Sequence, residues 1–156
     1  DLIKQSDVQF IWQTGKYYYD EMAAAVKAYG ELPNLKVLDF ISDMGAAYKA
    51  ADLVVSRAGA SSISEFCLIG QPVILVPSPN VAEDHQTKNT MALVDKDAAV
   101  YVKDADAPDV LLTTALGIIN NAAKLESLHE NILKLALKNS AEAIADEVVK
   151  LARDGK

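Results

Sequence analysis

The residues best suited to chemistry lie between Arg57 and Glu65, in the sequence Arg-Ala-Gly-Ala-Ser-Ser-Ile-Ser-Glu. The five residues after Arg57 are all small, and the residues before it are mostly apolar and β-branched. A turn of this kind between a strand and a helix leaves the first backbone N–H groups of the helix accessible, at the positive end of its dipole. The predicted ligand of this turn is therefore an anion such as a pyrophosphate.

A purely structural interpretation of the same residues is also open. The stretch from Ser62 to Glu65 matches the capping box S-x-x-E, in which Ser62 caps the helix and Glu65 reaches back to the cap nitrogen. As part of a ligand site, Glu65 would instead accept hydrogen bonds from the two hydroxyls of a ribose whose phosphates lie on the turn. Short motifs recur by chance, so this stretch alone leaves both interpretations standing.

The elements around the turn form a predicted βαβ unit. The runs 53–55 and 73–76 do not alternate polar with apolar residues, which indicates strands covered on both faces, as in a parallel sheet. The segment between them has apolar residues at helical spacing and ends in a glycine and a proline, which predicts a helix packed on that sheet. These residues are Ile63, Phe66, Cys67, Gly70 and Pro72.

The whole chain repeats this alternation of strand and helix. Strands are predicted at 8–13, 35–40, 53–56, 73–77 and 98–102, each followed by a helix. The pattern predicts one α/β domain over residues 1–156, with a parallel sheet and flanking helices. Ligands of such sheets bind beyond the carboxyl ends of the strands. We therefore expect the loops containing Thr14, Ile41, residues 57–62, and His85 with Gln86 to converge on one rim.

His85 and Gln86 are the polar candidates in the fourth of these loops. An imidazole donates to a ligand oxygen, and a glutamine amide offers both a donor and an acceptor, which suits a sugar hydroxyl. Both residues could equally face water at a helix start. The other histidine, His129, lies in the polar part of a late helix and is predicted to be a surface residue, and the last two helices are expected to serve in packing.

Composition excludes several classes of function. The chain has 156 residues, 51% of them hydrophobic and 24% charged, which is ordinary for one soluble globular domain. The net charge of −7 argues against a nucleic-acid partner. The single cysteine, Cys67, excludes a disulfide framework and indicates a reducing interior. No apolar run approaches the roughly 20 residues needed to span a bilayer.

Four motifs together resemble the MurG family, the bacterial N-acetylglucosaminyltransferases that convert lipid I to lipid II in peptidoglycan synthesis. The resemblance extends from about Val8 to the C-terminus, in the family's order and spacing. It implies a GT-B glycosyltransferase, in which this chain is the Rossmann-like C-terminal domain that binds the donor UDP-GlcNAc. The motifs are Phe40–Met44, Ser56–Glu65, Gly70–Pro77 and His85–Asn89.

The resemblance also implies a role for individual residues. The phosphates and sugar would be bound by the turn at 60–62, with Ile63 and Ser64 in the same substrate-binding set. The ribose would be bound by Glu65, and the uracil by the backbone of Ile41. Thr14 would lie near the diphosphate. Gln86 would bond the GlcNAc hydroxyls, with His85 as its polar neighbour. In full, the implied set is Thr14, Ile41, Ala60, Ser61, Ser62, Ile63, Ser64, Glu65, His85 and Gln86.

Parts of the family's enzyme are missing from the sequence, according to the same resemblance. The first strand of the domain and the whole N-terminal domain are expected to be absent. That domain would bind lipid I, carry the catalytic base and make most of the membrane contact. No catalytic residue, cofactor or metal is thus expected in this chain, and the location implied is cytoplasmic, peripheral on the inner face of the membrane. The alternatives are another GT-B UDP-sugar transferase, a UDP-GlcNAc epimerase and a non-catalytic nucleotide-binding module.

Overall fold

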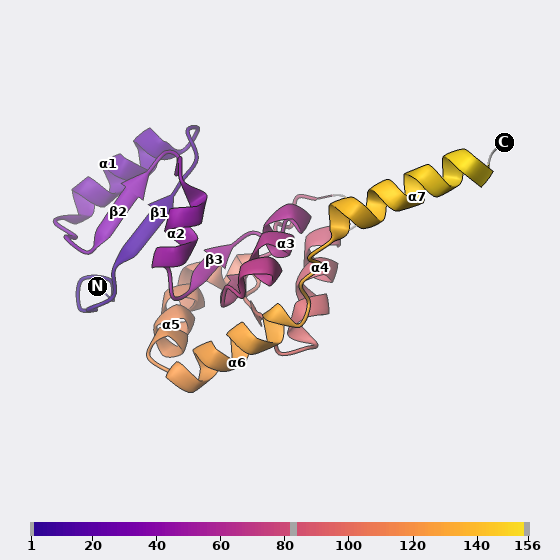
Figure 1. Cartoon of the computed structure of the whole chain (residues 1–156). Coiled ribbons are helices and arrows are strands. Elements are labelled where there is room, and N and C mark those ends of the chain that lie inside the picture. Colours follow the sequence, from indigo (N-terminus) through magenta and orange to yellow (C-terminus); the bar gives the residue numbers. More distant parts are fainter. Residues whose placement is uncertain (1, 82–83, 155–156) are drawn as a thin grey trace. The chain divides into compact units, whose positions relative to one another are not determined.

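The computed structural model describes residues 2–81 and 84–154. The chain divides into two compact units, residues 1–51 and residues 52–156, and each unit has its own parallel sheet (Figure 1).

The first unit consists of two strands and two helices. Its strands β1 (Phe10–Gln13) and β2 (Leu35–Leu38) pair in parallel, with Phe10 opposite Leu35. Helix α1 (Tyr19–Tyr29) connects them, and α2 (Met44–Ala50) follows β2. The side chain of Asp43 caps α2 by accepting a hydrogen bond of 2.8 Å from the amide of Ala46. This cap ends the loop after β2 and begins the helix, since aspartate is a favoured N-cap residue.

The second unit contains a three-stranded sheet and most of the helices. The parallel strands β3 (Val54–Ser56), β4 (Val73–Leu75) and β5 (Val100–Tyr101) are ordered β3-β4-β5. Between them lie α3 (Ala60–Ile69) and α4 (His85–Val94). A short 3₁₀ turn η2 (Asp104–Asp106) follows β5, and then come α5 (Ala107–Ile119), α6 (Ala122–Leu133) and α7 (Ser140–Asp154).

The predicted α/β architecture is confirmed, since each predicted strand is present within its expected range and all pairs are parallel. The strands do not pair into the single sheet that the sequence predicts. Strands β1 and β2 form one sheet, and β3, β4 and β5 form another. The βαβ unit around the turn is confirmed as β3-α3-β4.

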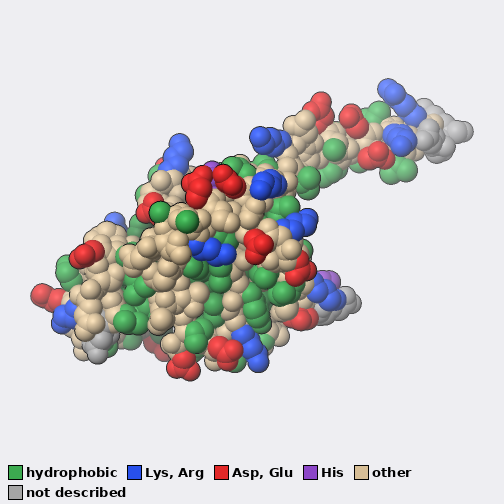
Figure 2. Space-filling model, turned by 90° about the horizontal axis from the view of Figure 1, so that it is seen from below, with side chains coloured by type: hydrophobic (Ala, Val, Ile, Leu, Met, Phe, Trp, Pro, Cys, Tyr) green, Lys and Arg blue, Asp and Glu red, His purple; other side chains and the backbone are tan. Residues whose placement is uncertain are grey.

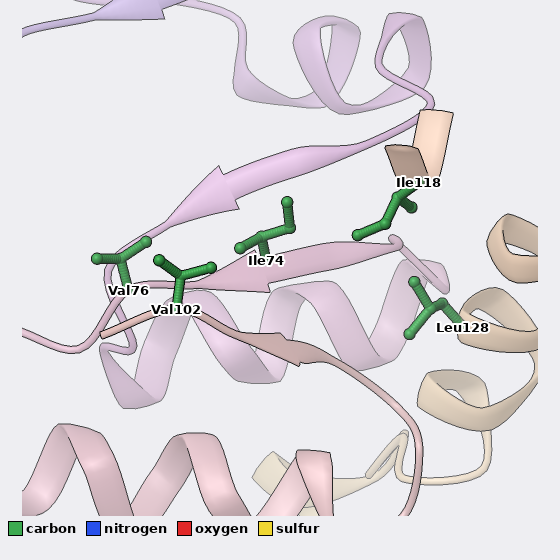
Figure 3. Close-up of a cluster of buried hydrophobic side chains, with 5 residues drawn as sticks. All are labelled: Ile74, Val76, Val102, Ile118 and Leu128. Atoms are coloured by element: carbon green, nitrogen blue, oxygen red, sulfur yellow. The ribbon is translucent and has the colours of Figure 1, made fainter. Parts of the chain in front are cut away.

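The core of the second unit lies between its sheet and the helices α5 and α6. Figure 3 shows Ile74 on β4 beside Val76 and Val102, with Ile118 from α5 and Leu128 from α6 facing them. All five are at most 7% exposed.

The second face of the sheet is covered as well along β4. All three residues of this central strand are buried, which confirms that it is covered on both faces. On α3, Phe66 and Cys67 are buried as their spacing predicts, and burial raises the pKa of the Cys67 thiol. The prediction is wrong for β3, where Val55 is 45% exposed, so this strand is not covered on both faces.

Of two predictions about the late helices, one is wrong and the other is confirmed only in part. His129 is half-buried on α6, and its Nδ1 donates to the carbonyl oxygen of Gly70 at 2.6 Å. This contact joins α6 to the end of α3, and it could not be seen from the polar neighbours of His129 in sequence. The apolar residues Ile144, Val148 and Leu151 of α7 are 60 to 70% exposed, so packing is confirmed for α6 but not for α7.

The surface carries both signs of charge. On the face shown in Figure 2, acidic and basic side chains are interspersed among hydrophobic ones and do not separate by sign. Within the part of the chain that the structure describes, no helix has the length and apolar character needed to cross a membrane.

Gly70 provides a test of how α3 ends. It has a φ of +72°, and a Cβ at this position would lie 2.6 Å from Cε1 of His129 and 2.7 Å from Cγ of Leu133. We expect Gly70→Ala to lower the free energy of unfolding by more than the roughly 1–2 kcal/mol that the left-handed conformation alone costs.

The matched control is Gly117→Ala in α5, where the added Cβ would meet no atom within 4 Å apart from its chain neighbours and the adjacent backbone of its own helix. We expect this change to stabilise the protein by roughly 0.5–1 kcal/mol, because alanine favours a helix interior. Urea unfolding of both variants gives the comparison. Equal stability of Gly70→Ala and the parent protein would show that the turn after α3 does not require glycine.

Candidate functional site

The turn between β3 and α3 presents the amino end of a helix. Gly59 is the N-cap residue, with extended backbone angles, and α3 begins at Ala60. The first hydrogen bond of the helix runs from the amide of Ile63 to the carbonyl of Gly59, at 3.0 Å. The amides of residues 60–62 precede this bond and have no acceptor inside the helix. The side chains at this end are small, and Ala60 and Ser61 are exposed.

The capping-box interpretation is wrong. Because the helix begins at Ala60, Ser62 is already its third residue and does not occupy the cap position. The hydroxyl of Ser64 donates to the carbonyl of Ala60 at 3.0 Å, a bond within the helix. Glu65 lies on the exposed surface one turn after Ser61 and Ser62. The ligand interpretation of the turn stays a prediction.

The electrostatics of this helix end favour an anion. The first turn of α3 contains no carboxylate, so no side chain of that turn offsets the positive end of the dipole. The adjacent guanidinium of Arg57 forms an ion pair with Asp104. Within residues 2–81 and 84–154, no three His, Cys, Asp or Glu side chains are grouped so as to hold a metal ion. The backbone amides of a helix amino end can bind an anion directly.

Ala58, the residue before the cap, is held from α4. The side-chain oxygen of Gln86 accepts from the amide of Ala58 at 3.2 Å and from the amide of Ser78 at 2.9 Å. The side-chain amide of Asn89 donates to the carbonyl of Ala58 at 3.3 Å. Both backbone polar groups of a fully buried residue are thus bonded to side chains of one helix.

Arg57 connects the turn to two other loops. Its Nη1 lies 3.2 Å from the carbonyl oxygen of Val76 and 3.4 Å from that of Pro77, and it also pairs with Asp104 in η2. These contacts link the ends of β3 and β4 with the turn that follows β5. These contacts give Arg57 a structural role, although the sequence alone assigns no contact to this residue.

His85 is the first residue of α4 and is exposed, directly before the half-buried Gln86. The preceding residue, Asp84, adopts the left-handed region with a φ of 54°, a conformation that aspartate tolerates better than most residues. This turn directs the chain into α4. Gln86 contacts the loop after β4 through the amide of Ser78, at 2.9 Å.

Thr14 and Ile41 lie in the first unit, and both already have hydrogen-bond partners there. The Thr14 hydroxyl is within reach of the carbonyls of Gly15 and Leu38, at 3.1 and 3.2 Å. The Ile41 amide donates to the side-chain oxygen of Gln13 at 2.8 Å. Binding of a ligand through the Thr14 hydroxyl proton or the Ile41 amide would thus replace an existing bond. Convergence of these two residues with those of the second unit stays a prediction.

One residue with a clear role was missed as a site residue by the sequence analysis. Asn89 appears there only as the last letter of a motif, although it contacts the backbone of the turn. The available signal was its spacing, because positions three apart on a helix, such as Gln86 and Asn89, share a face.

Comparison with known proteins identifies related sequences and structures. The chain matches the glycosyltransferase family 28 C-terminal domain over residues 1–152. It is 65% identical over 149 residues to the UDP-N-acetylglucosamine–N-acetylmuramyl-(pentapeptide) pyrophosphoryl-undecaprenol N-acetylglucosamine transferase of Bacteroides thetaiotaomicron, and 67% identical over 150 residues to that of Bacteroides fragilis. In both cases the alignment covers 96% of this chain but only 40% of the relative.

A solved structure supports the same relationship. The crystal structure of Acinetobacter baumannii MurG matches the chain with a TM-score of 0.81 and 30% sequence identity. The match covers 96% of this chain and 46% of that protein. The chain thus has the fold of one part of a longer glycosyltransferase.

The contacts of Arg57 predict an asymmetric pair of variants. Arg57→Met removes the bonds to both carbonyls and to Asp104, whereas Asp104→Asn removes the charge pair and leaves the carbonyl bonds. The Arg57 side chain is 56% exposed, so we discount the value of charged hydrogen bonds for screening. We expect a loss of roughly 1 kcal/mol in unfolding free energy for Arg57→Met and a smaller loss for Asp104→Asn. Equal losses in urea unfolding would show that the carbonyl contacts contribute nothing.

Proposed function

The chain belongs to the glycosyltransferase family 28 C-terminal domain family, and on this premise we propose that it binds UDP-GlcNAc as the donor domain of a MurG-type N-acetylglucosaminyltransferase. The observation that carries the proposal is the 65% identity to an enzyme named for this transfer, over 96% of the chain. The geometry of the turn before α3 supports it independently, since a nucleotide sugar has a diphosphate for that turn to bind.

The diphosphate is proposed to lie at the amino end of α3. The amides of Ala60, Ser61 and Ser62 would donate to its oxygens, and the small side chains there leave the approach open. Charge grows on the departing UDP as the bond to the sugar breaks. Preorganised amides stabilise this charge most strongly at that point, which is how a binding site becomes a site of catalysis.

The other parts of the donor are proposed to contact residues on either side. Glu65, one helical turn after the diphosphate amides, would accept hydrogen bonds from the ribose hydroxyls. Gln86 would bond a GlcNAc hydroxyl, with His85 beside it. For the first unit we extend the proposal to Thr14 near the diphosphate and to the backbone of Ile41 at the uracil. Ile63 and Ser64 complete the set. The Ile63 amide and the Ser64 hydroxyl are already bonded within the helix. The proposed role of these two residues therefore rests on their positions in the first turns of α3.

The reaction of the whole enzyme follows from the same proposal. The C4 hydroxyl of a lipid-linked muramyl sugar would attack the anomeric carbon of GlcNAc. A C–O bond to the acceptor forms, the bond to UDP breaks with inversion, and the hydroxyl proton passes to a base outside this chain. The acceptor would be lipid I and the product lipid II, at the inner face of the bacterial membrane. The chain spans about 40% of its relatives' length, and the acceptor site and membrane contact are assigned to the remainder.

Nucleotide selectivity tests the proposal directly. In calorimetric titrations we expect UDP-GlcNAc and UDP to bind the chain more tightly than ADP or GDP, because the uracil is read by the backbone of Ile41. UDP-glucose is the control for recognition of the sugar, and we expect it to bind more weakly than UDP-GlcNAc. ADP binding as tight as UDP would reduce the proposed site to a general diphosphate site.

Glu65 allows the ribose contact to be tested by itself. We expect Glu65→Ala to weaken UDP binding by roughly 1–3 kcal/mol, the value of a hydrogen bond to a charged group. Because the proposed contact is to the ribose hydroxyls, the variant should no longer distinguish UDP from 2′-deoxy-UDP, whereas the parent chain should. Glu126→Ala on the exposed surface of α6 makes the same change in net charge and should leave binding unaltered. If Glu65→Ala preferred UDP over 2′-deoxy-UDP as strongly as the parent chain does, Glu65 would not be part of the ribose site.

A further inference from the structure

We propose that Gln86 and Asn89 form a clamp that sets the orientation of the diphosphate-binding turn, so that both are positioning residues for the donor. This inference rests on the proposed function, because it concerns how the same turn binds UDP. It adds Asn89 to the residues that binding depends on, and it adds a second role to Gln86.

The clamp is defined by three hydrogen bonds to the loops around α4. Gln86 Oε1 accepts from the amides of Ala58 and Ser78, at 3.2 and 2.9 Å, and Asn89 Nδ2 donates to the carbonyl oxygen of Ala58 at 3.3 Å. Ala58 is 0% exposed, so water cannot replace these partners. A buried amide or carbonyl without a partner is costly, and the turn therefore favours the conformation in which both bonds form.

The helix that carries the clamp is itself fixed. Thr90 is fully buried, and its hydroxyl donates to the backbone carbonyl of Gln86 at 2.9 Å. Leu93, one turn later, is also buried. Gln86 and Asn89 thus project from an anchored face of α4, which is what a positioning residue requires.

The position of Ala58 explains how the clamp reaches the ligand. Ala58 directly precedes Gly59, the N-cap residue of α3, and the amides proposed to bind the diphosphate follow within the next three residues. A rotation of the peptide between Ala58 and Gly59 would change the direction in which α3 begins. The Asn89 bond to the Ala58 carbonyl opposes that rotation, and the Gln86 bond to the Ala58 amide holds the preceding peptide, between Arg57 and Ala58. Donors that are preorganised in this way bind an anion without a cost of reorganisation.

The clamp also restricts what Gln86 offers to a sugar. Its Oε1 is occupied by two backbone amides, which leaves Nε2 as the group that can contact a ligand. The Gln86 side chain would thus donate to a sugar oxygen and would not accept from a sugar hydroxyl proton. The two roles are separable, since one uses the oxygen and the other uses the nitrogen.

The first test replaces Asn89 by leucine, which has a similar volume and no donor. We expect the Kd for UDP and the Kd for UDP-GlcNAc to rise by the same factor, roughly two- to tenfold, because the turn binds the diphosphate that both ligands share. Asn131→Leu is the matched control, since Asn131 Nδ2 donates to the carbonyl of Asp97, also at 3.3 Å, between α6 and the loop after α4. We expect this control to leave both Kd values unchanged.

The second test observes the clamp without a ligand, by amide hydrogen exchange. Gln86→Met removes the acceptor and should accelerate exchange at Ala58 and Ser78. Gln86→Glu keeps an acceptor oxygen and should preserve slow exchange at both amides, although it lacks the Nε2 donor. A role confined to filling space would give the same exchange rates in both variants.

The outcomes separate the clamp from the function on which it rests. If the parent chain does not bind UDP, the proposed function fails, and the role of the clamp in binding fails with it. If the parent chain binds UDP and Asn89→Leu binds it equally well, the clamp alone is refuted. Unchanged exchange at Ala58 and Ser78 in Gln86→Met would refute it as well, even if Asn89→Leu fails to fold.

Discussion

The second unit depends on the need of one buried residue for hydrogen-bond partners to its backbone. Ala58 is fully buried at the point where β3 ends and α3 has not yet begun, so neither element supplies partners for its amide and carbonyl. Both partners come instead from α4, which lies after the next strand in the chain. The end of β3, the loop after β4 and α4 are thereby held in one arrangement. Arg57 extends this arrangement to η2 through its bonds to Val76, Pro77 and Asp104.

The proposed anion site is compatible with a net charge of −7 because the interactions that would bind the anion have a short range. The positive potential at the start of α3 comes from backbone amides and acts within the first turn, where residues 60–63 carry no carboxylate. Acidic residues elsewhere are screened over about 8–10 Å in physiological salt. The net charge of the chain therefore argues against a nucleic-acid partner but does not argue against a diphosphate bound by one turn.

Much of the fold could be predicted because its signals are local. The β3-α3-β4 unit is encoded by apolar runs, by Phe66 and Cys67 at helical spacing, and by Gly70, whose left-handed conformation ends α3. The capping box is wrong for a local reason, because α3 begins at Ala60, two residues before Ser62. The other failures concern contacts across space. The half-buried position of His129 depends on Gly70, 59 residues away. Gln86 was placed near the site by its motif and Asn89 was not, and their bonds to Ala58 span 28 and 31 residues and leave no local pattern.

The central claim is that the amides at the start of α3 bind the diphosphate of a uridine nucleotide. An NMR titration of the ¹⁵N-labelled chain with UDP observes these amides individually. The account predicts that the largest shifts fall on residues 59–63, and that uridine without phosphates leaves them nearly unchanged. Shifts concentrated in α5 or α6, with residues 59–63 unaffected by UDP, would contradict it.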